Sequence, residues 1–93
     1  MSIIQESPPE IIRRHDLHRI TVSMLATSAV ITYGYYGVFQ ERGLIAVGSK
    51  LEDSFNGFSF SEGEVIRLGE YDCKVVELAP DYIRIEVLGY RPL

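Results

Sequence analysis

The sequence predicts a mainly β fold: a small antiparallel meander or a barrel-like domain with a short N-terminal helix. Short apolar runs in its second half are separated by glycine, proline or asparagine. The last run, Tyr82 to Leu88, alternates apolar and polar residues as a strand with one solvated face does. The 93 residues suit one hydrophobic core. We therefore expect a single domain over 1–93, made of an arm and helix (1–19), an uncharged apolar segment (20–40) and a β module (43–90).

The predicted N-terminal helix rests on the motif Ser7-Pro8-Pro9-Glu10. A serine at the N-cap accepts a hydrogen bond from the main-chain N–H three residues on, and a glutamate at that position bonds back. Proline loses nothing in the first turn, because that N–H has no partner within a helix. We expect a helix that begins here and continues as far as His18.

Residues 20–40 form a run of 21 residues without a charge, and their pattern fits two structures. As a helix, the segment carries an apolar stripe that includes Val22, Leu25 and Ala29. As a strand, its first part alternates apolar residues with Thr21 and Ser23, and β-branched residues are frequent. The pattern leaves both interpretations open, so the N-terminal helix either ends before this segment or extends through it.

The same segment is long enough to cross a bilayer as a helix. Three arginines precede it, which favours a cytoplasmic N-terminus, and tyrosines gather at its far end, as they do at membrane interfaces. Several serine, threonine and glycine residues, and Arg42 beyond the segment, favour a buried part of a soluble domain instead. The protein is expected to be intracellular if it is soluble, and a membrane protein if residues 20–40 span a bilayer.

The second half of the chain predicts four or five strands in one antiparallel meander. Apolar runs indicate strands over Gly43 to Gly48, Glu64 to Leu68 and Asp72 to Leu78. Asn56-Gly57, between two phenylalanines, is typical of a hairpin turn, because both residues tolerate positive φ.

The final strand follows a turn predicted at Pro80-Asp81. In that strand Ile83, Ile85 and Val87 lie on one face and should point to the core.

The composition narrows the chemistry that the chain can perform. A net charge of −4 argues against nucleic-acid binding, which needs a basic face. Cys73 is the only cysteine, which excludes an internal disulfide, and its apolar surroundings predict a buried, inert thiol. His15 and His18 alone do not make a metal site.

Acidic residues are frequent but fall at predicted strand ends and loops, where solvated charge is ordinary. No phosphate loop, serine elbow or zinc framework occurs in the sequence. We therefore expect no catalytic residue, no metal and no cofactor, and we predict that the chain is not an enzyme.

The aromatic residues are the most suggestive group, because exposed rings on a small β domain can stack on a partner. We predict a non-enzymatic subunit that binds a protein partner or assembles into a homo-oligomer. The alternatives are a single-pass membrane-anchored β module and a small ligand-binding β-barrel. The predicted partner-binding residues are Tyr33, Tyr35, Tyr36, Phe39, Phe55 and Phe58.

Overall fold

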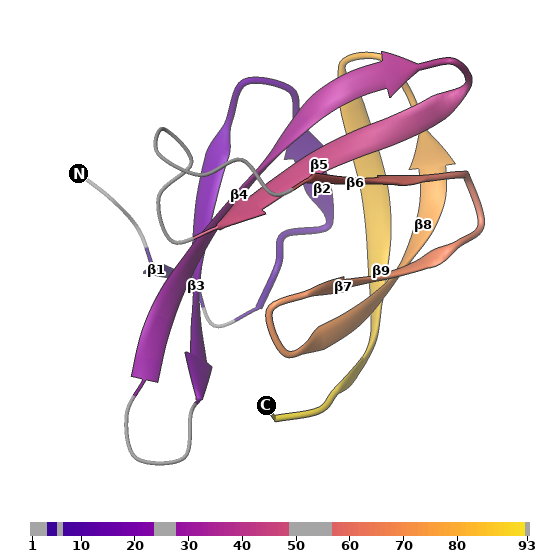
Figure 1. Cartoon of the computed structure of the whole chain (residues 1–93). Coiled ribbons are helices and arrows are strands. Elements are labelled where there is room, and N and C mark those ends of the chain that lie inside the picture. The colour runs from indigo at the N-terminus through magenta and orange to yellow at the C-terminus, as the bar shows by residue number, and fades with distance from the viewer. Residues whose placement is uncertain (1–3, 6, 24–27, 49–56, 93) are drawn as a thin grey trace.

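The computed structural model describes residues 4–5, 7–23, 28–48 and 57–92. These residues form nine strands in two sheets, and no helix occurs among them. Figure 1 shows the two sheets packed on each other as two layers. The prediction of a mainly β fold is thus confirmed.

The first sheet has five strands in the order β1-β3-β4-β5-β6. β1 runs parallel to β3, and all other neighbours in this sheet are antiparallel. Its strands are β1 (Ile4–Gln5), β3 (Leu17–Ser23), β4 (Ser28–Phe39), β5 (Arg42–Gly48) and β6 (Gly57–Phe60).

The second sheet has four antiparallel strands in the order β2-β9-β8-β7. The predicted module over 43–90 is therefore divided between two sheets, and its description as one meander is wrong. The strands are β2 (Ile11–Arg13), β7 (Val65–Leu68), β8 (Tyr71–Leu78) and β9 (Tyr82–Tyr90).

The core lies between the sheets and is filled from both. Burying one isoleucine or phenylalanine side chain contributes roughly 1.5–3 kcal/mol, so this layer is the main stabilising feature. The predicted alternation of the last strand is confirmed as far as Ile85, whereas Val87 is 41% exposed. The buried core residues are Ile12, Ile20, Tyr33, Tyr35, Ile45, Phe60, Ile66, Leu68, Cys73, Val75, Ile83 and Ile85.

The predicted N-terminal helix is absent, and residues 11–13 form a strand instead. Pro8 would be the first helical residue, but it precedes Pro9, and a residue before proline is driven towards extended conformations. The main chain bonds across to the second sheet, where the Ile85 N–H donates to the Glu10 carbonyl at 2.8 Å. The prolines therefore outweigh the capping signal.

The described residues of the uncharged segment, 20–23 and 28–40, lie in β3, in β4 and in the turn after β4, so the interpretation of this segment as a helix is wrong. β3 and β4 pair antiparallel from Leu17 opposite Gly34 to Ser23 opposite Ser28. Nowhere in the ranges that the model describes is a helix long and apolar enough to cross a membrane.

The tight turns differ in how well the sequence predicted them. Pro80-Asp81 links β8 to β9 as expected. Gly57 is not a turn residue, because it is the first residue of β6 and pairs with Ala46 of β5. Asn56 lies outside the described residues. An unpredicted two-residue turn joins β4 to β5 at Gln40 and Glu41, whose φ angles of 53° and 68° give the type I′ geometry.

The barrel-like alternative is not supported by the described strands. β1 and β6 end the first sheet, and β2 and β7 end the second. One isolated bridge, between Arg14 and Tyr35, connects the end of β2 to β4. On the opposite side, β6 and β7 are each bonded to one neighbour only within the described residues.

Candidate interaction surface

The six predicted partner-binding aromatics do not form one cluster. Tyr33 and Tyr35 are 0% and 1% exposed and belong to the core. They are two residues apart on β4, so both side chains point to the same face of the sheet, and that face is the inner one. The Tyr35 hydroxyl donates to the carbonyl of Ala79 at 2.6 Å, and burial raises the pKa of this phenol to about 12. Phe55 lies outside the described residues.

Tyr36 and Phe39 remain at the surface near the end of β4, with 40% and 58% exposure. Tyr36 is the extra residue of a β-bulge, since the pairing with β5 shifts between Tyr35 and Gly37. Tyr36 and Leu17 line a shallow pocket of about 230 Å³ on the first sheet. Tyr36 and Phe39 thus remain predicted partner contacts.

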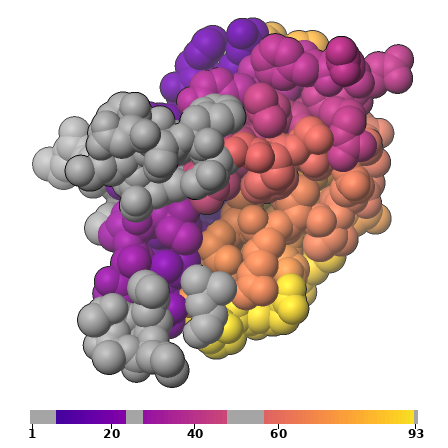
Figure 2. Space-filling model, in the orientation of Figure 1, coloured from indigo at the N-terminus to yellow at the C-terminus, as the bar shows by residue number. Residues whose placement is uncertain are grey.

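Phe58 lies at a different place, in a groove of about 340 Å³ between the two sheets. We call it the β6–β7 groove, because its walls are these two strands; they lie one above the other on the face shown in Figures 1 and 2. The rings of Phe58 and Phe60 lie 6.4 Å apart, centre to centre. The groove is lined by Phe58, Ser59, Phe60, Glu64, Val65, Ile66 and Arg67.

Arg42 holds the closed end of this groove in shape. Its Nε donates to the hydroxyl of Ser59 at 3.1 Å, and its Nη1 donates to the hydroxyl of Ser61 at 2.9 Å. The same guanidinium forms an ion pair with Glu64 at 3.4 Å, and the Glu64 carboxylate also accepts the N–H of Ser61. These contacts fix the short connection from β6 to β7, so the two strand edges keep their relative positions.

The edge of β7 presents main-chain groups to the groove. The Val75 N–H donates to the Glu64 carbonyl at 2.9 Å, so Glu64 faces β8. Along an antiparallel strand the main-chain groups point alternately to one neighbour and to the other. The N–H and C=O of Val65 and Arg67 therefore point away from β8 and towards the groove.

The two histidine side chains, His15 and His18, lie in different environments, one exposed and one partly buried. His15 is exposed in the β2–β3 connection with φ of 74°, whereas His18 points inward and its ring stacks on Tyr33 at 5.3 Å. Within the described ranges, no three His, Cys, Asp or Glu side chains are grouped so that they could hold a metal ion.

Cys73 is fully buried in β8, opposite Val87 of β9. Burial raises the pKa of its thiol to about 11, and the nearby Asp72 carboxylate adds to the rise. A thiol with that pKa carries almost no thiolate at neutral pH, so it is a poor nucleophile.

His18 makes the stability of the fold depend on pH. Burial lowers its pKa below 6.5, against an opposing effect of Asp16, and its Nε2 is buried without a hydrogen-bond partner in the part of the chain described. Below pH 6.5 the unfolded chain binds a proton that the folded chain resists, so the free energy of unfolding should fall as the pH is lowered. Urea unfolding across pH values from 6.5 down to 4.5 measures this.

His18→Phe should remove that loss, and His15→Asn, an exposed control that tolerates the positive φ, should retain it. The pKa values of Asp72 and Glu77 lie below their usual 3.8 and 4.5, so their paired carboxylates lose stability only at lower pH. An unchanged pH dependence in His18→Phe would contradict the assignment.

Most of the described acidic residues have structural partners. Glu62 accepts the Leu78 N–H at 3.0 Å, and Asp72 pairs with Arg91 at 2.7 Å. Glu70, in the β7–β8 turn, also has a partner, because its carboxylate accepts the N–H of Ser23; it is 1% exposed, whereas the sequence predicted solvated acidic residues. Glu52 and Asp53 lie outside the described residues.

Comparisons with known proteins give no relative for this chain. No family model, no curated protein and no solved structure matches it.

Proposed function

We propose that this protein is a non-enzymatic interaction module that binds an extended segment of a partner protein by adding it as a strand beside β7, in the β6–β7 groove. The observation that carries this proposal is the edge of β7, whose Val65 and Arg67 main-chain groups point into a groove floored by phenylalanine rings. Such an edge is a template for a further strand.

The chemistry of the groove defines the segment that would fit. Main-chain hydrogen bonds to β7 give affinity for any extended chain, and alternate side chains of that chain would point to Phe58, Phe60 and Ile66. The preferred segment therefore alternates apolar and polar residues. A proline at a position facing β7 would remove a donor and weaken binding.

The strands β6 and β7 are each at the edge of a sheet, and an edge strand without a partner risks aggregation. Exposed edges promote unspecific pairing, and proteins usually protect them with charge or a bulge. Here Glu64 and Arg67 carry charge, while Val65, the first residue of β7 and between them in the sequence, is apolar and 56% exposed. An apolar centre between charged ends favours one register of the bound segment.

The test uses random peptides displayed on phage, selected against the immobilised full chain. We expect enrichment of peptides with alternating apolar residues, and nuclear magnetic resonance titration of the synthetic peptides should shift the amide signals of Val65 and Arg67. Val65→Pro should weaken binding about tenfold or more, because it removes one main-chain donor from the edge. The N–H that it removes points away from β8, so the β7–β8 ladder stays intact.

Val65→Ala is the matched control, since it shortens the side chain but keeps the N–H; it should bind the peptides nearly as well as the natural chain. Equal binding by Val65→Pro and Val65→Ala would overturn strand addition. Light scattering covers a second copy as the occupant: a dimer that Val65→Pro dissociates would replace the partner segment with self-assembly and overturn the proposal.

A further inference from the structure

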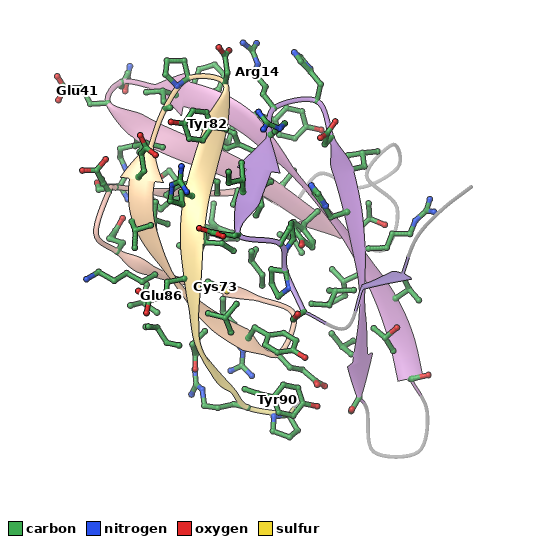
Figure 3. All side chains as sticks on the ribbon, turned by 180° about the vertical axis from the view of Figure 1, so that it is seen from behind. Arg14, Glu41, Cys73, Tyr82, Glu86 and Tyr90 are labelled. Atoms are coloured by element: carbon green, nitrogen blue, oxygen red, sulfur yellow. The ribbon has the colours of Figure 1, made fainter. Side chains whose placement is uncertain are left out.

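The β6–β7 groove has two unlike ends. At the closed end, the charge of Glu64 is paired with that of Arg42. The open end lies where β7 stops, opposite Tyr71, and Tyr71 is opposite Tyr90, which marks this end of the second sheet in Figure 3. The other charged residue of the groove lining, Arg67, belongs to this open end. A bound segment would thus meet an ion pair at one end of the groove and a cation at the other.

Arg67 presents its side chain on the outer face of the second sheet. Its neighbours along β7, Ile66 and Leu68, are 6% and 0% exposed and point to the core. Successive side chains of a strand point to opposite faces, so Arg67 points outward, as Val65 does. In an added strand, the residue directly opposite Arg67 has its side chain on the same outer face, within reach of the guanidinium. The residue opposite Ile66 points inward, to the phenylalanine rings.

Two main-chain carbonyls hold the Arg67 guanidinium at the open end. Its Nε donates to the carbonyl of Gly69 at 3.2 Å, and its Nη2 donates to the carbonyl of Arg91. A guanidinium has more N–H donors than these two bonds use, so it can still donate to a carboxylate. The side chain is held in place before a ligand arrives, which lowers the entropy cost of pairing with it.

The acidic residues near this end have other partners. Asp72 lies opposite Arg67 on β8, on the side of β7 away from the groove, and its two carboxylate oxygens accept from Arg91 at 2.7 and 2.8 Å. Glu70, in the β7–β8 turn, accepts the N–H of Ser23 and is 1% exposed. A strand added beside β7 would therefore meet the guanidinium of Arg67 before either carboxylate.

The pairing of the second sheet favours one direction for the added strand. All of the described neighbours in this sheet are antiparallel, and antiparallel pairing is slightly more stable per residue than parallel pairing. A segment antiparallel to β7 runs from the open end of the groove to the closed end. It passes Arg67 first, then Ile66, then Val65.

We propose that the bound segment carries an acidic residue immediately before an apolar one and lies antiparallel to β7; this inference rests on the strand addition proposed above. The acidic side chain pairs with Arg67 on the outer face, and the apolar side chain that follows it enters the groove at Ile66. The Arg42–Glu64 pair has no net charge, so the segment needs no charged residue at the closed end.

The experiment is a nuclear magnetic resonance titration of the isotope-labelled full chain with short blocked peptides flanked by glycine and serine. Their central residues are Val-Glu-Val-Thr-Val, Val-Lys-Val-Thr-Val or Val-Thr-Val-Glu-Val. The first should bind about tenfold more tightly than the second at about 20 mM salt, because one cross-strand pair changes from attraction to repulsion. That ratio should fall towards one at about 500 mM salt, since the pair is exposed and is screened.

The third peptide has the composition of the first in reverse order, so it tests direction. It should bind more weakly than the first, because an antiparallel segment then places its glutamate away from Arg67. Tighter binding of the third peptide would mean that the added strand is parallel to β7, and would overturn the proposal.

Variants at Arg67 test the source of the preference. Arg67→Glu should reverse it, so that the lysine peptide binds more tightly, and Arg67→Gln should abolish it. Arg13→Glu is the matched control, because it makes the same change of net charge on β2, at the other edge of the second sheet, and it should keep the preference. A preference that persists in Arg67→Gln would overturn the proposal, and Arg67→Gln decides the question if Arg67→Glu fails to fold.

Val65→Pro separates this inference from the proposed function. If the glutamate and lysine peptides bind the natural chain equally and Val65→Pro weakens both, strand addition stands and the acidic preference is wrong. If neither peptide binds, or if Val65→Pro has no effect on binding, the proposed function fails and this inference fails with it.

Discussion

Gly43→Ala should lower the free energy of unfolding by about 1–3 kcal/mol, the usual cost of overpacking a core. An added Cβ would lie 2.6 Å from Cζ of Phe60 and 2.8 Å from Cδ1 of Leu78. Phe60 is 1% exposed, so its ring cannot move aside without displacing other core residues. Gly43 is not among the glycines with positive φ, so the loss is steric rather than conformational.

Gly89→Ala is the matched control on β9. Nothing lies within 4 Å of the Cβ that it would add, so its effect should stay within about 0.5 kcal/mol. Urea unfolding followed by circular dichroism measures both variants. If the two substitutions cost the same, the side chains of Phe60 and Leu78 do not limit the space at Gly43, and the predicted overpacking is wrong.

Strands in the second half of the chain could be predicted because their signal is local. Apolar residues repeat with a period of two, and glycine or proline marks the ends, so the predicted strands at 43–48, 64–68, 72–78 and 82–88 match β5, β7, β8 and β9 closely. The division into two sheets is not local. No local sequence pattern indicates that β2 pairs with β9 or that β6 and β7 belong to different sheets.

The failed prediction of a helix has a local cause that was available in the sequence. The capping pattern at Ser7 only shows that the first N–H groups of a helix could be hydrogen-bonded. The Pro8-Pro9 pair, in contrast, restricts the φ and ψ angles of the main chain. The cap forms only if the main chain is helical, and the proline pair disfavours the helical conformation at Pro8. Ile11 and Ile12, both β-branched, then favour the strand that pairs with β9.

The candidate site was predicted only in part, because residue type does not reveal which face of a strand is buried. The spacing of Tyr33 and Tyr35 places both rings on one face, but only the packing of the second sheet makes that face the interior. Tyr36, the next residue, points to the opposite face and is therefore at the surface. Phe58 was singled out as an aromatic residue, yet its groove depends on two strands from different sheets.

Tyr33→Phe should raise the free energy of unfolding, by about 1–3 kcal/mol if the hydroxyl bears the full cost of an unsatisfied buried group. Among the described residues, the Tyr33 hydroxyl is buried and has no hydrogen-bond partner. Burial raises the pKa of this phenol, so it is neutral and its O–H stays in the core at every ordinary pH. Phenylalanine keeps the ring and its stacking on His18 but removes the polar atom.

Tyr35→Phe is the matched opposite, because it removes the same atom from a ring two residues away on the same strand. The Tyr35 hydroxyl donates to the Ala79 carbonyl, so its loss should cost about 1 kcal/mol and leave that carbonyl unsatisfied. Urea unfolding of both variants at one pH therefore gives changes of opposite sign. A loss of stability in both variants would mean that the Tyr33 hydroxyl is bonded in solution, and a bound water in the core would then be the partner to look for.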